Sequence, residues 1–212
     1  MSNLLILGAG GHGKVVADIA ASTNLWDNIA FLDSNPIATS GLDHPILGPF
    51  DDYGKFIDKY KYAFVAIGNN RRRIIWLNYL EEAGYKLPVI IHPFSSVSKY
   101  SIINRGSVIM PGAIVNADVK VGRGAILNTS CSVDHDCILG IGVHISPGAR
   151  LSGTVGVGDY TWVGVGSNIS NNISIGSDVL VAAGSTVIKS VPSNVMVAGT
   201  PAKIKKTFGD EK

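Results

Sequence analysis

Residues 121–151 read VGRGAILNTSCSVDHDCILGIGVHISPGARL and carry an aliphatic side chain at every sixth position. The same spacing continues over sixteen positions, which are Val97, Ile103, Ile109, Val115, Val121, Leu127, Val133, Leu139, Ile145, Leu151, Val157, Val163, Ile169, Ile175, Val181 and Val187. A second series, four residues after each of these, consists almost entirely of small or β-branched side chains. A period of six fits neither an α-helix nor a flat strand. It is typical of a hexapeptide parallel β-helix, in which each six-residue unit forms one face of a triangular coil.

Both series are expected to point inward and to form the core of the prism. Glycines at corner positions are expected to provide tight turns with positive φ; they are Gly106, Gly112, Gly122, Gly124, Gly140, Gly142, Gly148, Gly158, Gly164, Gly176 and Gly184. The two cysteines, Cys131 and Cys137, lie in the second series, one hexapeptide apart and therefore on different faces. This spacing favours neither a disulfide nor a zinc site, so we expect two buried packing residues.

Composition excludes several classes of protein. The 212 residues include 18 basic and 16 acidic side chains, and a net charge of +2 gives no excess for binding nucleic acid. The apolar run at residues 4–7 is too short for a secretory leader or a membrane span. We therefore expect a cytoplasmic protein with no membrane insertion.

The first part of the chain has a different pattern. Strands are expected at residues 4–7, 29–32 and 62–67, and helices at residues 14–22 and 71–83. Alternating strands and helices predict a small parallel α/β sheet. The six-residue spacing begins after His92, so the expected domains are residues 1–92 and 93–212.

A glycine loop follows the first predicted strand. Gly8, Gly10 and Gly13 match the G-x-G-x-x-G pattern, and Asp33 lies about twenty residues further on. Glycines allow the backbone to approach a phosphate, which the following helix N-terminus also favours. A dinucleotide site is one interpretation, but a single three-strand half fits a mononucleotide or nucleotide-sugar better. A purely structural turn is the third interpretation.

His135 is the strongest catalytic candidate in the predicted prism. It lies outside both inward series and between two carboxylates, Asp134 and Asp136. A carboxylate that accepts the Nδ1 proton makes Nε2 a better base. His144 lies half a coil away and is expected near the same corner. The alternatives are a surface histidine or a structural hydrogen bond at an oligomer contact. No metal is expected, since no third ligand is evident.

Five segments carry a family resemblance: GAGGHGK from Gly8, AIGNN from Ala66, DHDC from Asp134, VHISPGA from Val143 and AGTPAK from Ala198. On these the chain resembles the sugar O-/N-acyltransferases of the left-handed β-helix superfamily. That group includes sialic acid O-acetyltransferases and nucleotide-linked amino-sugar N-acetyltransferases. The resemblance implies a left-handed coil and a homotrimer, with acetyl-CoA bound in the groove between adjacent prisms.

The resemblance also implies roles for individual residues. His135 is implied as the general base and Asp136 as the acid that orients it, although Asp stands where close relatives carry Glu. The implied acetyl-CoA contacts are His144, Gly153, Val165 and Ala183. The implied nucleotide-sugar contacts are Gly10, Gly11, His12, Asp33, Ser34, Gly68 and Arg71.

The function expected from this resemblance is transfer of acetyl from acetyl-CoA to the 4-amino group of a UDP-linked 4-amino-4,6-dideoxy sugar of the bacillosamine type. The product would enter a surface polysaccharide or a glycoprotein sugar. Because both cysteines are expected to point inward, direct transfer in a ternary complex is favoured over a covalent intermediate. The alternatives are O-acetylation of sialic acid or CMP-sialic acid, and a non-catalytic nucleotide-sugar-binding protein.

Overall fold

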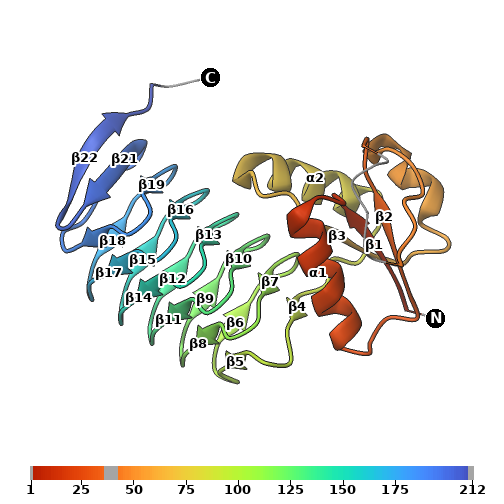
Figure 1. Ribbon diagram of the computed structural model, residues 1–212, viewed down its shortest axis with the longest axis horizontal. Helices are drawn as coiled ribbons and strands as arrows, with labels where there is room; N and C mark the ends of the chain where they lie inside the picture. Colours follow the sequence, from red (N-terminus) through yellow and green to blue (C-terminus); the bar gives the residue numbers. More distant parts are fainter. Residues whose placement is uncertain (1, 36–42, 210–212) are drawn as a thin grey trace. The chain divides into compact units, whose positions relative to one another are not determined.

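The computed structural model describes residues 2–35 and 43–209 and divides into two compact units (Figure 1). Unit 1 is Met1–Pro93 and unit 2 is Phe94–Lys212. The division falls one residue after the position expected from the sequence. No helix among the described residues is long and apolar enough to cross a membrane.

Unit 1 is built on a three-stranded parallel sheet with the order β2-β1-β3. Its elements in chain order are β1 (Asn3–Leu7), α1 (Gly11–Ser22), β2 (Asn28–Leu32), the 3-10 helix η1 (Phe50–Phe56), β3 (Tyr62–Val65), α2 (Asn70–Glu82) and β4 (Ile90–Ile91). Every residue of β1 is buried, as expected for the central strand of a covered parallel sheet.

The helices of unit 1 follow the capping pattern of the sequence. Helix α2 begins at a side-chain cap, because Asn69 Oδ1 accepts a hydrogen bond from Arg72 N at 2.9 Å. It ends before Gly84, whose φ of +91° suits glycine. Helix α1 begins three residues earlier than predicted, so Gly11 and His12 lie in its first turn. The glycine loop is consequently shorter than the sequence suggests.

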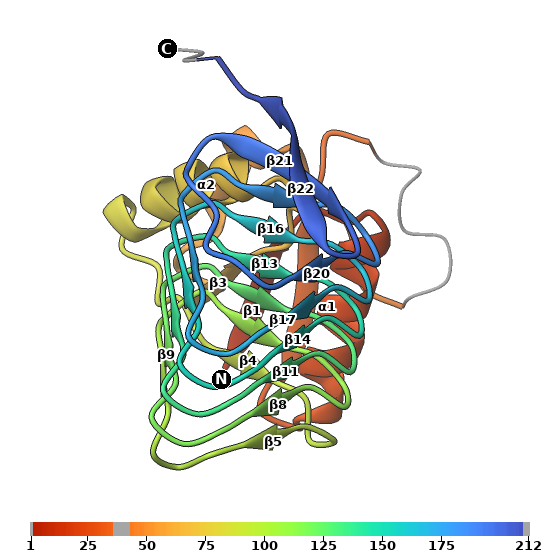
Figure 2. The same ribbon diagram turned by 90° about the vertical axis from the view of Figure 1, so that its left-hand side faces the viewer.

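Unit 2 is a triangular parallel β-helix whose stacked coils are seen in Figures 1 and 2. The first face contains β7 (Val108–Ile109), β10 (Ile126–Leu127), β13 (His144–Ile145), β16 (Trp162–Val163), β19 (Leu180–Val181), β21 (Val195–Gly199) and β22 (Ala202–Thr207). The second contains β5 (Ser96–Val97), β8 (Ile114–Val115), β11 (Ser132–Val133), β14 (Arg150–Leu151), β17 (Asn168–Ile169) and β20 (Thr186–Val187). The third contains β6 (Ile102–Ile103), β9 (Lys120–Val121), β12 (Ile138–Leu139), β15 (Gly156–Val157) and β18 (Ser174–Ile175).

From β5 to β20, neighbouring coils pair in parallel with an offset of eighteen residues, as in Val133↔Leu151 on the second face. The parallel pair β19 and β21 has an offset of sixteen, as in Leu180↔Met196. The strand pair β21 and β22 differs, because it is antiparallel and contains a register shift. This hairpin ends the prism.

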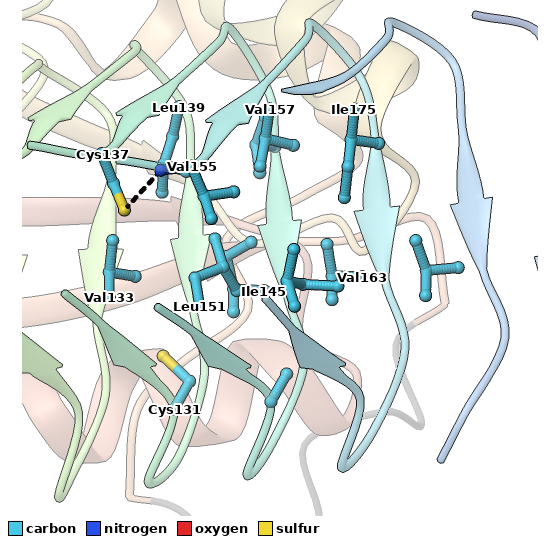
Figure 3. Packing of buried hydrophobic residues seen from close by; sticks show 14 of the residues in the cluster. Cys131, Val133, Cys137, Leu139, Ile145, Leu151, Val155, Val157, Val163 and Ile175 are labelled. Atoms are coloured by element: carbon cyan, nitrogen blue, oxygen red, sulfur yellow. Dashed lines mark hydrogen bonds between the residues drawn. The ribbon is translucent and has the colours of Figure 1, made fainter. Parts of the chain in front are cut away.

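The core of unit 2 consists of the two inward series (Figure 3). The aliphatic residues from Ile109 to Val187 are all buried, and only Val97 and Ile103 in the first coil are partly exposed. Cys131 and Cys137 are buried free thiols, as the sequence predicts. Burial raises the pKa of the Cys131 thiol to about 12, which keeps it protonated.

Polar side chains of the second series form hydrogen bonds with main-chain groups of the next coil. Thr161 Oγ1 donates to Gly176 O at 2.7 Å and accepts from Val179 N at 3.0 Å. Ser107 makes the same pair of bonds with Gly122 O and Ala125 N. The thiol of Cys137 follows this pattern too, since it accepts from Val155 N at 3.4 Å (Figure 3). These side chains link consecutive coils, and among the described residues no buried hydroxyl lacks a hydrogen-bond partner.

The turns repeat as regularly as the core. A left-handed φ recurs every sixth residue from 106 to 184, at seven glycines and at Asp118, Ser130, Asp136, Thr154, Tyr160, Asn172 and Asp178. The expectation of positive φ is wrong for Gly122, Gly140, Gly158, Gly164 and Gly176, where φ is not in this range. At these positions a Cβ would collide with the backbone or with Asp159 or Ser residues of the next coil, so close approach requires the glycine.

Candidate active site

His135 lies in the turn that joins β11 on the second face to β12 on the third. We call this the histidine edge, defined by residues 134–136 and 152–154. Its Nδ1 is 2.7 Å from Asp136 Oδ2, and both side chains are 58% exposed. Asp136 takes the left-handed φ of +60° that recurs in these turns. The backbone of the β-helix therefore sets the pair in place.

This contact settles the protonation pattern of the imidazole. Because the Asp136 carboxylate can only accept, Nδ1 donates and the neutral ring carries its lone pair on Nε2. The hydrogen bond to Asp136, supported by the negative charges of Asp134 and Asp136, raises the pKa of His135 above its ordinary value. His135 is a partly exposed base with an oriented lone pair.

Asp134 fixes the backbone of the same turn. Its Oδ1 accepts from His135 N and, from the preceding coil, Asn116 Nδ2, each at 2.8 Å. The Asn116 amide, followed by the His135 N–H, lowers the pKa of Asp134. The two carboxylates next to His135 therefore bind different groups: Asp134 accepts from the main-chain N–H of His135, and Asp136 accepts from its imidazole ring.

His144 lies on β13 of the first face and is 91% buried. Its ring stacks on Trp162 in the next coil, with centroids 5.3 Å apart and planes at 6°. Asn128 Nδ2 approaches His144 Nε2 at 3.2 Å, and since Asn128 Oδ1 accepts from Thr129 N, the amide nitrogen is the donor. Nε2 is thus an acceptor and the proton of a neutral His144 resides on Nδ1.

Val165 and Ala183 are exposed and occupy a second edge, where the first face turns into the second. We call it the Val165 edge, defined by residues 146–149, 164–166 and 182–184. The two positions stack on adjacent coils, because Gly184 N donates to Val165 O at 2.8 Å. The expectation that His135 and His144 share a corner is wrong: the residues between them cross the whole third face before His144 is reached. Within one chain, Gly153 lies beside His135, whereas His144, Val165 and Ala183 belong to the first face and its edge.

In unit 1 the loops after β1 and β3 meet. A Cβ at Gly8 would lie 2.7 Å from Ala66 O, and a Cβ at Gly13 would collide with the Gly8 carbonyl. These two glycines serve close packing of the loop, while Gly10, the N-cap of α1, and Gly11 have open space beside them. In a 2-1-3 sheet the strand order reverses between β1 and β3, which is where such sheets bind ligands.

Arg73 is a residue of this loop region that the sequence reasoning missed. Its guanidinium is fully buried, and it donates to Ile67 O at 2.9 Å, Gly68 O at 3.2 Å and Asn70 Oδ1 at 2.9 Å. The signal was available, because Arg73, Leu77 and Leu80 recur at helical spacing on the buried face of α2. The predicted contact Arg71 is exposed instead.

His12 also belongs to this region. Its Nε2 is buried and has no hydrogen-bond partner among the described residues. Burial, and then the positive charge of Arg73, lowers the pKa of His12 to about 4. His12 is therefore neutral at pH 7.

The carboxylate of Asp33 is hydrogen-bonded to the main chain of the glycine loop. Its Oδ2 accepts from Ala9 N at 2.7 Å and its Oδ1 accepts from Asn35 N at 2.8 Å. Ser34 next to it is exposed. The predicted nucleotide-sugar contacts after β1, β2 and β3 thus lie at the same carboxyl end of one parallel sheet. Over the described ranges, no three His, Cys, Asp or Glu side chains are grouped to hold a metal ion.

Comparison with known proteins adds to this geometry. The PglD N-terminal domain family matches residues 3–80. The acetyltransferase domain of PglB from Neisseria gonorrhoeae FA1090, in complex with acetyl coenzyme A, is 40% identical, with 96% of this chain and 98% of that chain covered and a TM-score of 0.91. A variant of perosamine N-acetyltransferase from Caulobacter crescentus, in complex with CoA and GDP-perosamine, is 34% identical over 97% and 98%, with a TM-score of 0.93.

A curated relative, UDP-N-acetylbacillosamine N-acetyltransferase from Bacillus subtilis (strain 168), is 36% identical over 113 residues. The match spans about half the length of both proteins, 52% of each. A small three-stranded parallel sheet followed by a left-handed β-helix of hexapeptide repeats is the architecture of the hexapeptide-repeat sugar acyltransferases. The chain belongs to the family of hexapeptide-repeat sugar acetyltransferases.

Proposed function

We propose that this protein transfers acetyl from acetyl-CoA to the 4-amino group of a nucleotide-linked 4-amino-4,6-dideoxy sugar, with UDP as the nucleotide. The observation that carries the proposal is the His135–Asp136 pair, which provides an oriented base on an exposed edge of the prism. The names of the relatives support the substrate class, since they include a UDP-linked bacillosamine enzyme and a complex with GDP-perosamine.

The chemistry follows from the protonation state of His135. The amine nitrogen attacks the thioester carbonyl carbon while His135 Nε2 takes its proton, and Asp136 stabilises the imidazolium that forms. The tetrahedral intermediate then expels CoA, whose sulfur receives the proton from His135. The products are the N-acetyl sugar and CoA, and the base returns to its starting form. His144 is a candidate donor to the intermediate oxyanion.

The thiols take no part in this scheme. Cys131 and Cys137 are buried, and burial raises the pKa of each, so neither provides an accessible thiolate. This favours direct transfer between two bound substrates over an acyl-enzyme.

The acceptor nucleotide is proposed to bind at the loops after β1, β2 and β3 of unit 1. Gly10 and Gly11 are open toward a ligand, and the N-termini of α1 and α2 follow β1 and β3, the strands on either side of the switch point. Such helix ends favour the charge of a diphosphate. The cytoplasmic location and the entry of the product into a surface glycan stay predictions.

A homotrimer is proposed as the active assembly. Val165 and Ala183, the proposed acetyl-CoA contacts, lie on one edge of a single prism, and His135, the proposed base, lies on another. If all these residues serve one reaction, the Val165 edge of one copy has to meet the histidine edge of the next. A ring of three prisms achieves this with a single repeated contact.

The first test replaces His135 with Ala and measures acetyl transfer to UDP-, GDP- and CMP-linked amino sugars and to sialic acid. We expect kcat to fall by about 10²–10⁴-fold with nucleotide-sugar binding kept. Undiminished transfer by His135→Ala would show that His135 is not the base. A parent protein that transfers acetyl to none of these acceptors would leave a nucleotide-sugar-binding protein as the better description. His44→Ala, in unit 1, is the matched control.

The acceptor is tested by thermal shift with the same nucleotides. We expect UDP-sugars to stabilise the protein most, because a ligand that binds only the folded state raises the unfolding temperature. Stabilisation by CMP-sialic acid and by no UDP- or GDP-sugar would contradict the proposed substrate class.

The trimer is tested by mixing two inactive variants, His135→Ala and Val165→Arg. If each site combines edges from two copies, re-assembled mixed trimers contain some sites with neither substitution and regain part of the activity. Absence of any regained activity, with subunit exchange shown by mass, would contradict a shared site.

A further inference from the structure

Gly153 lies directly against the imidazole of His135. A Cβ built at Gly153 would be 2.5 Å from Cε1, 2.5 Å from Nε2 and 3.1 Å from Nδ1 of His135, and these are its three nearest atoms. Real Cβ atoms do not approach other atoms at 2.5 Å, so the ring occupies the space that any side chain at residue 153 would need. No backbone atom is among these contacts.

The backbone itself does not require glycine at residue 153. Four turns place Ala117, His135, Gly153 and Asn171 at the same register, in steps of eighteen residues, so Ala117 lies one coil before His135 and Asn171 one coil after Gly153. Across the four turns the following residue has nearly the same φ, which is +59° at Asp118, +60° at Asp136, +61° at Thr154 and +58° at Asn172. The φ of Gly153 lies outside the left-handed range. The turn therefore accepts a side chain wherever no histidine lies in the coil below.

We propose that Gly153 is a positioning residue, whose missing side chain lets His135 hold its ring on Asp136 with Nε2 available. This inference rests on the proposed function of His135 as the base. It gives Gly153 a role through the base in addition to any contact with acetyl-CoA.

The consequence of an added methyl group follows from the geometry. With Ala at residue 153 the imidazole must rotate away, because the ring is the end of a side chain and the neighbouring backbone is fixed by Thr154 N donating to His135 O at 2.9 Å. Rotation separates Nδ1 from Asp136 Oδ2 and turns Nε2 away from its former direction. His135 therefore loses both its orientation and its hydrogen bond to the Asp136 carboxylate.

The experiment compares Gly153→Ala with Gly156→Ala. Gly156 lies three residues further on, and its Cβ would meet only Ser174 Oγ at 4.0 Å. For Gly153→Ala we expect kcat to fall by about tenfold to a hundredfold, with KM for acetyl-CoA unchanged and the acid limb of the pH–rate profile moved to lower pH. Gly156→Ala should behave as the parent protein.

A double-mutant cycle shows whether the effect passes through the ring. In the His135→Ala background, Gly153→Ala should change the residual rate by less than about twofold, because coupled residues are not additive. A raised KM for acetyl-CoA with kcat kept, or an equal loss in both backgrounds, would overturn the inference.

The same variants separate this inference from the proposed function. If His135→Ala keeps full activity, the proposed role of His135 as the base fails, and the inference fails with it; if it is inactive and Gly153→Ala is fully active, only the inference fails. If Gly153→Ala does not fold, folding restored in the His135→Ala/Gly153→Ala protein supports the steric contact. A double variant that is also unfolded overturns it.

Discussion

Two histidines, one in each unit, have opposite surroundings. His135 is exposed and bonded to Asp136, and its pKa is raised; His12 is buried beside Arg73, and its pKa is lowered to about 4. The same side chain is thus prepared to gain a proton in the prism and to remain neutral in the α/β unit. A base that must accept a proton suits the first setting. The second setting keeps the charge of the proposed nucleotide-binding loop unchanged near pH 7.

Among substitutions that change the surroundings of these two histidines, the largest expected effect comes from Asp136→Asn, which removes the negative charge beside His135. We expect kcat to fall by about tenfold to a hundredfold, because the amide no longer stabilises the imidazolium. The pKa of His135 should fall, so the acid limb of the pH–rate profile moves to lower pH. NMR titration of the His135 ring checks the direction, and an unchanged profile would show that Asp136 does not set the basicity.

The second prediction concerns His12 and acid. Its pKa is lowered from 6.5 in the unfolded chain to about 4 in the folded one, so the unfolded state binds more protons between these values. The stability of unit 1 should therefore be full above pH 6.5 and decline as the pH falls toward 4. Urea unfolding followed by the fluorescence of Trp26 and Trp76 measures this. In His12→Gln the decline over this interval should shrink, and an unchanged decline would assign it to other groups.

The third prediction concerns Arg73, whose positive charge lowers the pKa of His12. Arg73→Met leaves the carbonyls of Ile67 and Gly68 without these hydrogen bonds and should destabilise unit 1 by about 1–3 kcal/mol. The pKa of His12 should rise, though not to 6.5, because burial is the larger cause. Urea unfolding and ring titration measure the two effects. Arg72→Met, whose side chain is exposed, is the control and should change neither.

The smallest expected effect comes from Asn116→Ala, which distinguishes the role of Asp134 from that of Asp136. Asn116→Ala removes one bond to Asp134 at the surface, so the stability should change by at most about 1 kcal/mol. The pKa of Asp134 should rise toward its ordinary value, while kcat should stay near that of the parent. A loss of kcat as large as that of Asp136→Asn would mean that the turn backbone, rather than the Asp136 contact, controls the base.

Much of the β-helix was predictable because its pattern is local and repeated. Each aliphatic position specifies the same burial, so an eighteen-residue offset between coils follows from the period alone. The reason for each glycine was not predictable from this pattern. At Gly112 the turn requires a left-handed φ, whereas at Gly122 the next coil leaves no room for a Cβ, and composition cannot distinguish these causes.

The sequence singled out candidate site residues but not their grouping in space. His135 stood out by its carboxylates and its place outside the inward series. Its distance from His144 was misjudged, because nine residues of a coil include a full face and two turns. Arg73 was missed, since an arginine is expected at the surface unless its helical register with Leu77 and Leu80 is taken into account.

The sequence by itself determined the prism and the α/β unit and singled out His135 as the proposed base, because these depend on spacing along the chain and on neighbouring residues. Only the tertiary structure decided which edge each candidate occupies, how Arg73 is buried and why residue 153 is glycine. Those properties arise where segments eighteen or more residues apart come into contact. Steric exclusion and burial act between such segments, and no local pattern in the sequence records them.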